Sequence, residues 1–289
     1  MISDSRAAVP ATYWATRLMT ASAQPIQVFR VVGQWVVFIA QTFWLLPLTV
    51  RKYRREALHQ MNNLAWGRGS IIVDGGVISV LLLLGIAVGS SLAIEALATL
   101  NQIGFGALSG LLSGVGCVRE IGPLVGGIAF AAQTGCRMTA EIGAMRIGEE
   151  IDAIEAMGLR PISFVVGTRL IGGMACVIPG YLLTLITTFF VTDMVVVKFH
   201  HQNSGTFNHY FVEFLTPRDL AYSVIKVAVF CAVVTLIHCY YGYFASGGPV
   251  GVGQASGRAV RASLVMIMVM DLTLTVMLWG LQPVFVFKG

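Results

Sequence analysis

The sequence predicts an all-α polytopic membrane protein with an N-terminal interfacial helix, five transmembrane helices and a short cytoplasmic helix between the second and the third. Hydrophobic residues make up 56% of the 289-residue chain and charged residues only 11%, whereas about a quarter of a soluble domain is charged. Uncharged apolar runs of roughly the 20 residues that a membrane-spanning helix needs recur along the chain. Both observations favour a membrane protein over a large soluble all-α domain.

The N-terminal segment, residues 1–50, is predicted to lie in the membrane interface. Residues 11–31 mix aromatic, basic and small polar side chains, as do helices that lie along a membrane surface. Residues 32–50 are uncharged and long enough to span, but two glutamines and Pro47 favour an interfacial or partly inserted segment. The first 30 residues lack the compact apolar core and cleavage site of a signal peptide, so we expect the first span to direct insertion.

The remaining chain, residues 51–289, is predicted to form one membrane domain. Its five expected spans cover about 70–97, 103–135, 162–191, 220–243 and 262–285. A polar loop at 193–219 precedes the fourth span, and a glycine-rich loop at 246–258 precedes the fifth. Within the polar loop we expect a short amphipathic helix around 208–215.

The distribution of positive charge predicts which loops are cytoplasmic. Cytoplasmic loops of membrane proteins are enriched in Lys and Arg, and the most basic stretch of this chain is 51–55. Placing that stretch inside puts eleven Lys and Arg residues inside and three outside. The eleven are Arg51, Lys52, Arg54, Arg55, Arg68, Arg137, Arg146, Arg160, Arg169, Arg258 and Arg261, and the three are Lys198, Arg218 and Lys288. We therefore expect a cytoplasmic N-terminus and an extracytoplasmic C-terminus.

The most charged part of the chain is the segment 135–161, between the second and third spans. It holds five of the 14 acidic residues, namely Glu141, Glu149, Glu150, Asp152 and Glu155. Ile147, Ile151 and Ile154 recur at helical spacing. Arg146 and Glu150 are spaced for an i,i+4 ion pair, and a glycine followed by a proline then marks a helix end. We expect a short amphipathic helix at about 139–157 that contacts a soluble partner.

Four ionisable residues fall within the predicted spans: Arg119, Glu120, Lys226 and Asp271. A charge in hydrocarbon is costly, so each is expected to face the bundle interior and to find a partner. A pair of Lys226 with Glu120 or with Asp271 fits their depths in the spans. Such a pair either fixes the register of the helices or moves when the protein changes conformation.

Small residues repeat every four positions in the second span, at Gly106, Gly110 and Gly114. Such a ladder lets two membrane helices approach closely. Two interpretations are open: the ladder forms a seam between two chains, or it packs against a helix of its own chain.

The sequence contains no recognisable pattern for catalysis or metal binding. His200, His201 and His209 lie in the polar loop without metal-ligand spacing. No Walker A motif or catalytic constellation occurs, and the five cysteines lie singly in or beside apolar segments. The net charge of +5 comes from residues that flank spans, so it does not indicate nucleic-acid binding. We expect this chain to have no enzymatic activity and to bind no metal or cofactor.

Three runs resemble the MlaE/YrbE permease family: REIGPL at 119–124, TAEIGAMR at 139–146 and EEIDAIEAM at 149–157. The resemblance covers roughly residues 50–285, so it identifies 51–289 as an MlaE-type permease domain. The stretch HCYYGY at 238–243, followed by SGGPVGVG, is similar to B-type YrbE subunits of actinobacterial Mce systems.

The resemblance implies a permease subunit of an ATP-binding-cassette lipid transporter in the inner membrane. The helix at 139–157 would be the coupling helix that docks on a cytoplasmic ATPase, through Glu141, Arg146, Glu149, Glu150, Asp152, Glu155 and Met157. A paired A-type YrbE permease and an Mce-domain hexamer on the outer face would complete the complex, and ATP and Mg²⁺ would bind to the ATPase. The substrate would be a fatty or mycolic acid, a sterol or a phospholipid, with import as the expected direction.

ATP binding would then move the helix around 141–157 as a rigid handle. We expect its acids to meet the ATPase, because its apolar row needs cover. Two other classes of function are open. A secondary transporter often has two related halves, which this sequence lacks, and a structural anchor for an outer Mce assembly would need no charges inside the membrane.

Overall fold

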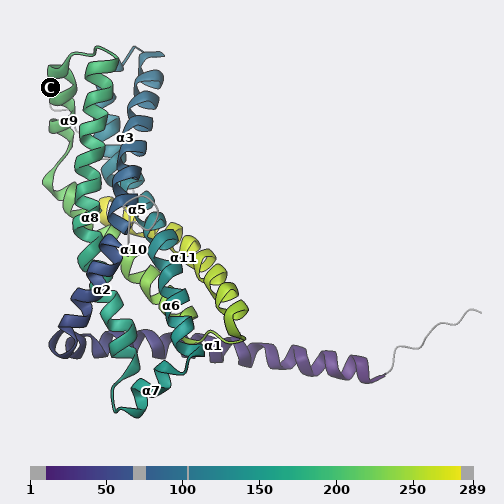
Figure 1. Ribbon diagram of the computed structural model, residues 1–289. Helices are drawn as coiled ribbons and strands as arrows, with labels where there is room; N and C mark the ends of the chain where they lie inside the picture. The colour runs from purple at the N-terminus through teal and green to yellow at the C-terminus, as the bar shows by residue number, and fades with distance from the viewer. Residues whose placement is uncertain (1–10, 68–75, 103, 281–289) are drawn as a thin grey trace, which may run out of the picture. The chain divides into compact units, whose positions relative to one another are not determined.

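The computed structural model describes residues 11–67, 76–102 and 104–280 (Figure 1). The chain divides into two units, Met1–Trp44 and Leu45–Gly289. The described residues are almost entirely helical, which confirms the all-α prediction. The expected span residues 70–75, 103 and 281–285 lie outside the described part, as do Arg68 and Lys288.

The first unit contains most of helix α1, Ala11–Lys52, which continues into the second unit. The part of α1 from Phe29 to Lys52 is long and apolar enough to cross a membrane. It includes residues 32–50, for which the sequence allowed a crossing by length. An interfacial placement of this helix stays a prediction.

The second unit contains the remaining helices. Their bounds are α2 Arg54–Trp66, α3 Val77–Gln102, α4 Ser109–Gly116, α5 Gly122–Phe130, α6 Cys136–Ile147, α7 Glu150–Ala156, α8 Thr168–Asp193, α9 Ser204–Phe214, α10 Pro217–Tyr243 and α11 Gly248–Trp279. Five stretches of this unit are long and apolar enough to span: Val77–Gln102, Ser109–Ile147, Ile162–Phe199, Pro217–Tyr243 and Gly248–Trp279. With the segment in α1, the described residues offer six candidate spans, as a multi-pass membrane protein requires.

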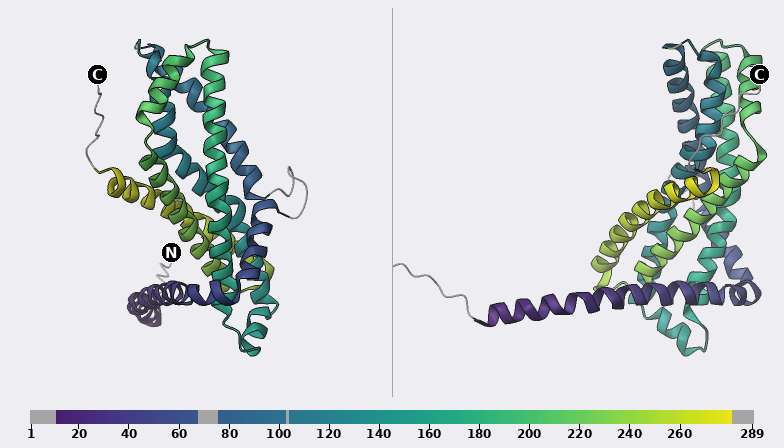
Figure 2. Two further views of the ribbon diagram at one scale, coloured as in Figure 1. Left: turned by 90° about the vertical axis from the view of Figure 1, so that its left-hand side faces the viewer. Right: turned by 180° about the vertical axis from the view of Figure 1, so that it is seen from behind.

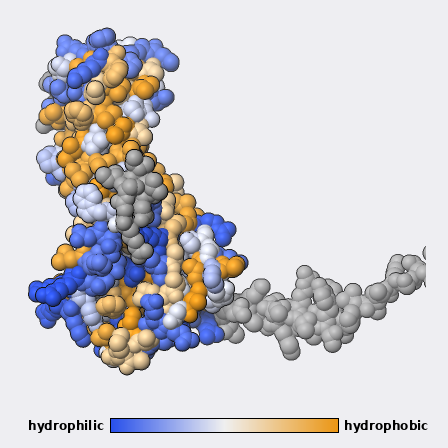
Figure 3. Space-filling model, in the orientation of Figure 1, coloured by the Kyte–Doolittle hydropathy of each residue, from blue (hydrophilic) through white to orange (hydrophobic). Residues whose placement is uncertain are grey.

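Two helices organise the packing of this unit. Helix α8 packs along α2 and α3, and helix α10 packs against α6, α8 and α11 (Figure 2). On the face shown in Figure 3, hydrophobic side chains form a band between two hydrophilic ends. This is the distribution that a bilayer with an apolar core and polar surfaces selects.

The second candidate span is a continuous helical path from Ser109 to Ile147 that twice widens into π-helix. The π segments are η2, Cys117–Ile121, and η3, Ala131–Gly135. Single π-helical turns are rare and occur frequently at functional sites. Segment η2 carries both Arg119 and Glu120.

The predicted helix at 139–157 is wrong in its extent. Residues up to Ile147 continue the second span as α6, and a separate short helix, α7, covers Glu150–Ala156. Glu149 has a φ of 57°, which is left-handed and therefore interrupts the helix between them. Segment 139–157 thus turns a corner, so it is not one rigid rod.

The glycine-rich loop predicted at 246–258 is also wrong, because α11 already begins at Gly248. Gly247, with a φ of 90°, makes the turn. From there Gly251, Ala255 and Ala259 form a buried stripe along one helix face. The packing of these small residues outweighs the low helix propensity of glycine. By contrast, the short helix expected around 208–215 is present as α9.

Candidate functional site

A buried charged cluster joins η2, α10 and α11, and Lys226 is at its centre. The Lys226 side chain is fully buried, and its Nζ lies 2.8 Å from Asp271 Oδ1 and 3.3 Å from Glu120 Oε2. Nζ also donates hydrogen bonds to the Arg119 carbonyl and to Thr275 Oγ1, both at 2.8 Å. Thr275 Oγ1 donates in turn to Glu120 Oε1 at 2.8 Å. Both predicted pairings of Lys226 are therefore confirmed.

Arg119 joins a second, adjoining group. Its Nε lies 3.1 Å from Asp219 Oδ1, at the start of α10. Asp219 also accepts hydrogen bonds from Trp279 Nε1 and from Thr216 Oγ1, each at 2.6 Å. The Trp279 ring lies 5.6 Å from both the Arg119 guanidinium and Lys226 Nζ, within cation–π range. Each buried charge of the cluster thus has an opposite charge beside it.

Four members of these two adjoining groups are not among the predicted site residues: Thr216, Asp219, Thr275 and Trp279. The sequence places Asp219 at the end of the predicted polar loop 193–219, and the side chains of Thr216, Thr275 and Trp279 carry no charge that would indicate a role. A buried cation needs more than one oxygen around it. This need predicts that Lys226 and Arg119 have further oxygen-bearing partners. Which residues these are depends on the register of α10 against α11.

A second ion-pair group lies on α6 and α8. Glu141 contacts Arg137 Nε at 2.9 Å and Arg169 Nη2 at 3.4 Å. Arg137 also donates to the Asn63 carbonyl at 3.2 Å, which ties α6 to α2. Arg169 is buried and donates to the Val165 carbonyl. Glu141 is therefore held inside the chain by two arginines, away from the exposed acids of α7.

Helix α7 and the corner at Glu149 before it present the other acids outward. Glu149, Glu150, Asp152 and Glu155 are exposed, as is Met157. Ile151 and Ile154 are buried under them, whereas Ile147 is 42% exposed. The predicted Arg146–Glu150 pair is wrong, since Arg146 Nη1 binds Asp152 Oδ1 at 2.7 Å across the corner at Glu149. The corner leaves a compact acidic surface, α7, that a soluble protein can reach.

The glycine ladder of the second span faces a helix of the same chain. A Cβ at Gly110 would meet the Phe207 carbonyl oxygen of α9 at 2.6 Å, and one at Gly114 would meet the Phe211 ring at 3.2 Å. Gly106 lies against the side chain of Asn101. These contacts support packing within one chain as the role of the ladder.

A buried histidine outside the predicted site residues joins three helices. Thr139 Oγ1 of α6 lies 2.8 Å from His238 Nδ1 of α10, and Ser263 Oγ of α11 lies 3.3 Å from Nε2. Close beside this ring, the absence of a side chain at Gly242 of α10 lets α6 approach. A Cβ at Gly242 would lie 3.0 Å from the Thr139 carbonyl oxygen. Helix α6 is therefore packed tightly against α10 and α11.

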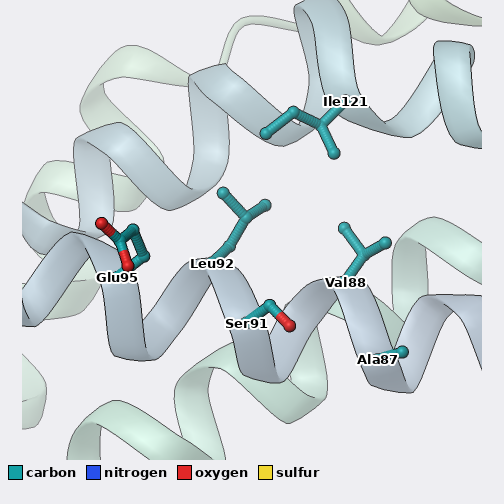
Figure 4. Close-up of a pocket in the computed structure, with 6 residues that line it drawn as sticks. All are labelled: Ala87, Val88, Ser91, Leu92, Glu95 and Ile121. Atoms are coloured by element: carbon teal, nitrogen blue, oxygen red, sulfur yellow. The ribbon is translucent and has the colours of Figure 1, made fainter.

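An open apolar cavity lies between α3 and η2. It has a volume of about 420 Å³ and is lined by Ala87, Val88, Ser91, Leu92, Glu95 and Ile121. Figure 4 shows Ile121 facing Leu92 and Val88 across the cavity, with Glu95 at one end. Ile121 directly follows the charged pair Arg119 and Glu120, so the cavity borders the residues next to the buried cluster.

The arrangement is that of a membrane bundle with a buried ionic centre, an apolar cavity and an exposed acidic helix. A sequence model described as permease MlaE matches residues 70–277, which is more than half of the chain. The chain belongs to the MlaE permease family. All the predicted cluster residues and the whole of α7 lie inside the matched region.

Relatives of this MlaE-family chain occur in bacteria and in a plant. A probable ABC transporter permease of Rickettsia conorii is 30% identical over 54% of this chain and 61% of its own length. The intermembrane phospholipid transport system permease protein MlaE of Haemophilus influenzae is 27% identical over 70% and 77%. The chloroplastic protein TRIGALACTOSYLDIACYLGLYCEROL 1 of Arabidopsis thaliana is 26% identical over 68% and 57%. The chain thus matches about three fifths of the length of the rickettsial relatives.

Proposed function

We propose that this chain is the membrane-spanning subunit of an ATP-driven lipid transporter, and that a separate ABC ATPase binds and hydrolyses ATP with Mg²⁺. The observation that carries the proposal is the family match over 70–277, with a relative named as a phospholipid transport permease. ATP hydrolysis is assigned to a partner because the sequence carries no Walker A motif.

The ATPase docks on α7 in this proposal. Four carboxylates of this region, Glu149, Glu150, Asp152 and Glu155, are exposed, while Ile151 and Ile154 are already covered by the chain itself. The free surface is therefore acidic, and it is complementary to a basic groove on a soluble partner. The positive-inside bias supports a cytoplasmic position for α7. Arg146 shapes this surface by holding Asp152 across the corner.

The lipid enters through the cavity between α3 and η2. Its lining is apolar apart from Ser91 and Glu95, as suits an acyl chain. Movement of α7 reaches this region through α6, which packs against α10 and α11, the helices that carry Lys226 and Asp271.

The paired permease is an A-type YrbE chain, an Mce-domain hexamer covers the outer face, and transport runs inward. The similarity of 238–243 to B-type YrbE chains supports the A-type partner and the Mce-domain hexamer, whereas inward transport is part of the proposal alone.

Reconstitution tests the proposal. The chain, co-expressed with a second permease chain and an ABC ATPase, is placed in vesicles that contain a fluorescent phospholipid. We expect the ATPase to co-purify with the chain and lipid movement to require ATP. Lipid movement without ATP would favour a secondary transporter, and an assembly that moves no lipid with active ATPase would favour a structural anchor. Either result would overturn the proposal.

A further inference from the structure

A second cavity shares no lining residue with the first. It lies among three helices: the C-terminal end of α1, helix α2 and helix α8. Its volume is about 210 Å³, and its apolar lining includes Val50, Leu58, Ile171 and Ala175. Val50, Leu58 and Ala175 are exposed, so the cavity opens to the outside of the bundle. All of these residues belong to the second unit.

The depth of this cavity in the membrane can be inferred from the residues that α8 contributes to it. Ile171 and Ala175 follow Arg169 within two helical turns, and the Arg169 guanidinium contacts Glu141 of the charged segment. The cavity therefore sits where the apolar part of the bundle meets its charged end. In a bilayer this level is occupied by lipid, at the junction of acyl chains and headgroups.

The opening of the cavity is positively charged. Arg54 lines it, and Arg51, Lys52 and Arg55 flank Arg54 in the sequence. All four are exposed, and among the described residues none of them forms an ion pair. The nearby carboxylate of Glu56 accepts a hydrogen bond from Gln60. One arginine without an acidic partner thus lines an apolar cavity at headgroup level, and three more exposed cations lie within three residues of it in the sequence.

From this combination we propose that the cavity is a binding site for an anionic phospholipid of the surrounding leaflet. One acyl chain lies in the apolar cavity, and the phosphate meets Arg54 with the cations beside it. Apolar shape alone does not select a lipid inside a bilayer, because every lipid offers acyl chains. Selection comes from the charge, since clusters of Lys and Arg at a membrane face attract anionic headgroups.

The bound lipid has a structural role distinct from that of a transported lipid. Helix α2 packs on α8, and Gly172 allows the close approach, since a Cβ there would lie 2.9 Å from the Ala57 carbonyl oxygen. A lipid held by Val50, Arg54 and Ala175 contacts α1, α2 and α8 together. It would fasten the end of α1 to the bundle.

The test measures lipid retention by the purified full-length chain, without transport or ATP. The chain is purified from nanodiscs that contain phosphatidylglycerol and phosphatidylcholine, and the retained lipid is measured by mass spectrometry. We expect the wild type to retain phosphatidylglycerol preferentially. Arg54→Gln should lower that preference by about fivefold, the effect of one cation near an anionic surface.

Two further variants separate a site from diffuse attraction. Ala175→Phe fills the cavity from an exposed position and should also reduce retention, whereas Arg261→Gln removes an exposed arginine outside the cavity and should leave retention unchanged. Equal retention by the wild type and Arg54→Gln, or by the wild type and Ala175→Phe, would overturn the proposal. An equal loss in Arg261→Gln would do so too. Since no ATPase takes part, failure here is distinct from failure of the proposed transport function.

Discussion

The ring of His238 occupies the space into which a side chain at Gly135 would extend. A Cβ at Gly135 would lie 2.5 Å from His238 Nε2 and 2.6 Å from Cδ2. The ring cannot easily turn aside, because it is fully buried and lies between the hydroxyls of Thr139 and Ser263. A glycine on one helix and a histidine on another therefore fix the approach of η3 to α10.

Gly135→Ala should destabilise the protein by about 1–3 kcal/mol, the usual effect of overpacking a core. Thermal unfolding in detergent measures the change. Gly257→Ala is the matched control, because a Cβ at Gly257 meets nothing within 4 Å, and it should be neutral or slightly stabilising. The double variant Gly135→Ala with His238→Ser should be less destabilised than the two single changes together. Additive losses would contradict the steric explanation.

Lys226→Met should strongly destabilise the bundle, by about 3–5 kcal/mol, because Asp271 and Glu120 lose their shared cation. Adding Asp271→Leu should recover part of the loss, since it removes one of the two unpaired carboxylates. The unfolding midpoint of purified protein measures both, with the exposed Lys198→Met as control. If Lys226→Met kept wild-type stability but lost transport, the cluster would serve a conformational change during transport and would not be needed to fix the register of the helices.

Trp279→Phe should lower the free energy of unfolding by about 1.5–3 kcal/mol, which is the contribution of a hydrogen bond to a charged group. The indole Nε1 donates to Asp219 Oδ1, and phenylalanine keeps an aromatic ring but not the donor. A double-mutant cycle with Asp219→Asn should show coupling between the two positions. Independent, additive effects would show that the bond contributes little.

Reversing the charge of the exposed acids on α7 and at Glu149 just before it should weaken binding of the ATPase. The variant Glu149→Lys, Asp152→Lys and Glu155→Lys places like charges against the proposed basic groove, and such contacts cost several kcal/mol. We expect at least about tenfold weaker association in a pull-down titration, with lipid movement uncoupled from ATP hydrolysis. Glu213→Lys, an exposed acid on α9, is the control. Unchanged association and transport would refute docking through these acids.

Gly110→Ala should loosen α9 without changing the association of permease chains. The added methyl group would press on the Phe207 carbonyl oxygen, which is backbone and cannot turn away. Faster hydrogen exchange in α9 measures the effect, and Gly116→Ala is the control because a Cβ there meets nothing within 4 Å. A loss of chain association with an unchanged α9 would instead restore the interpretation of the ladder as a seam between chains.

The amino-acid pattern alone predicts the fold class, the approximate positions of the spans and the need of Lys226 for an acidic partner. These follow from the cost of placing polar groups in hydrocarbon, which acts on each segment locally. For the same reason the charge of 149–155 was enough to assign its acids to an exposed surface.

The residues that meet across helices are known only from the folded arrangement. It placed Asp219 and Trp279 beside Arg119, moved Glu141 from the acidic surface to Arg137 and Arg169, and divided the charged segment at Glu149. It also made a helix of the glycine-rich stretch after Gly247. The physical reason is common to all of these: helix register and close packing depend on contacts between segments far apart in the chain, which local periodicity and propensity do not encode.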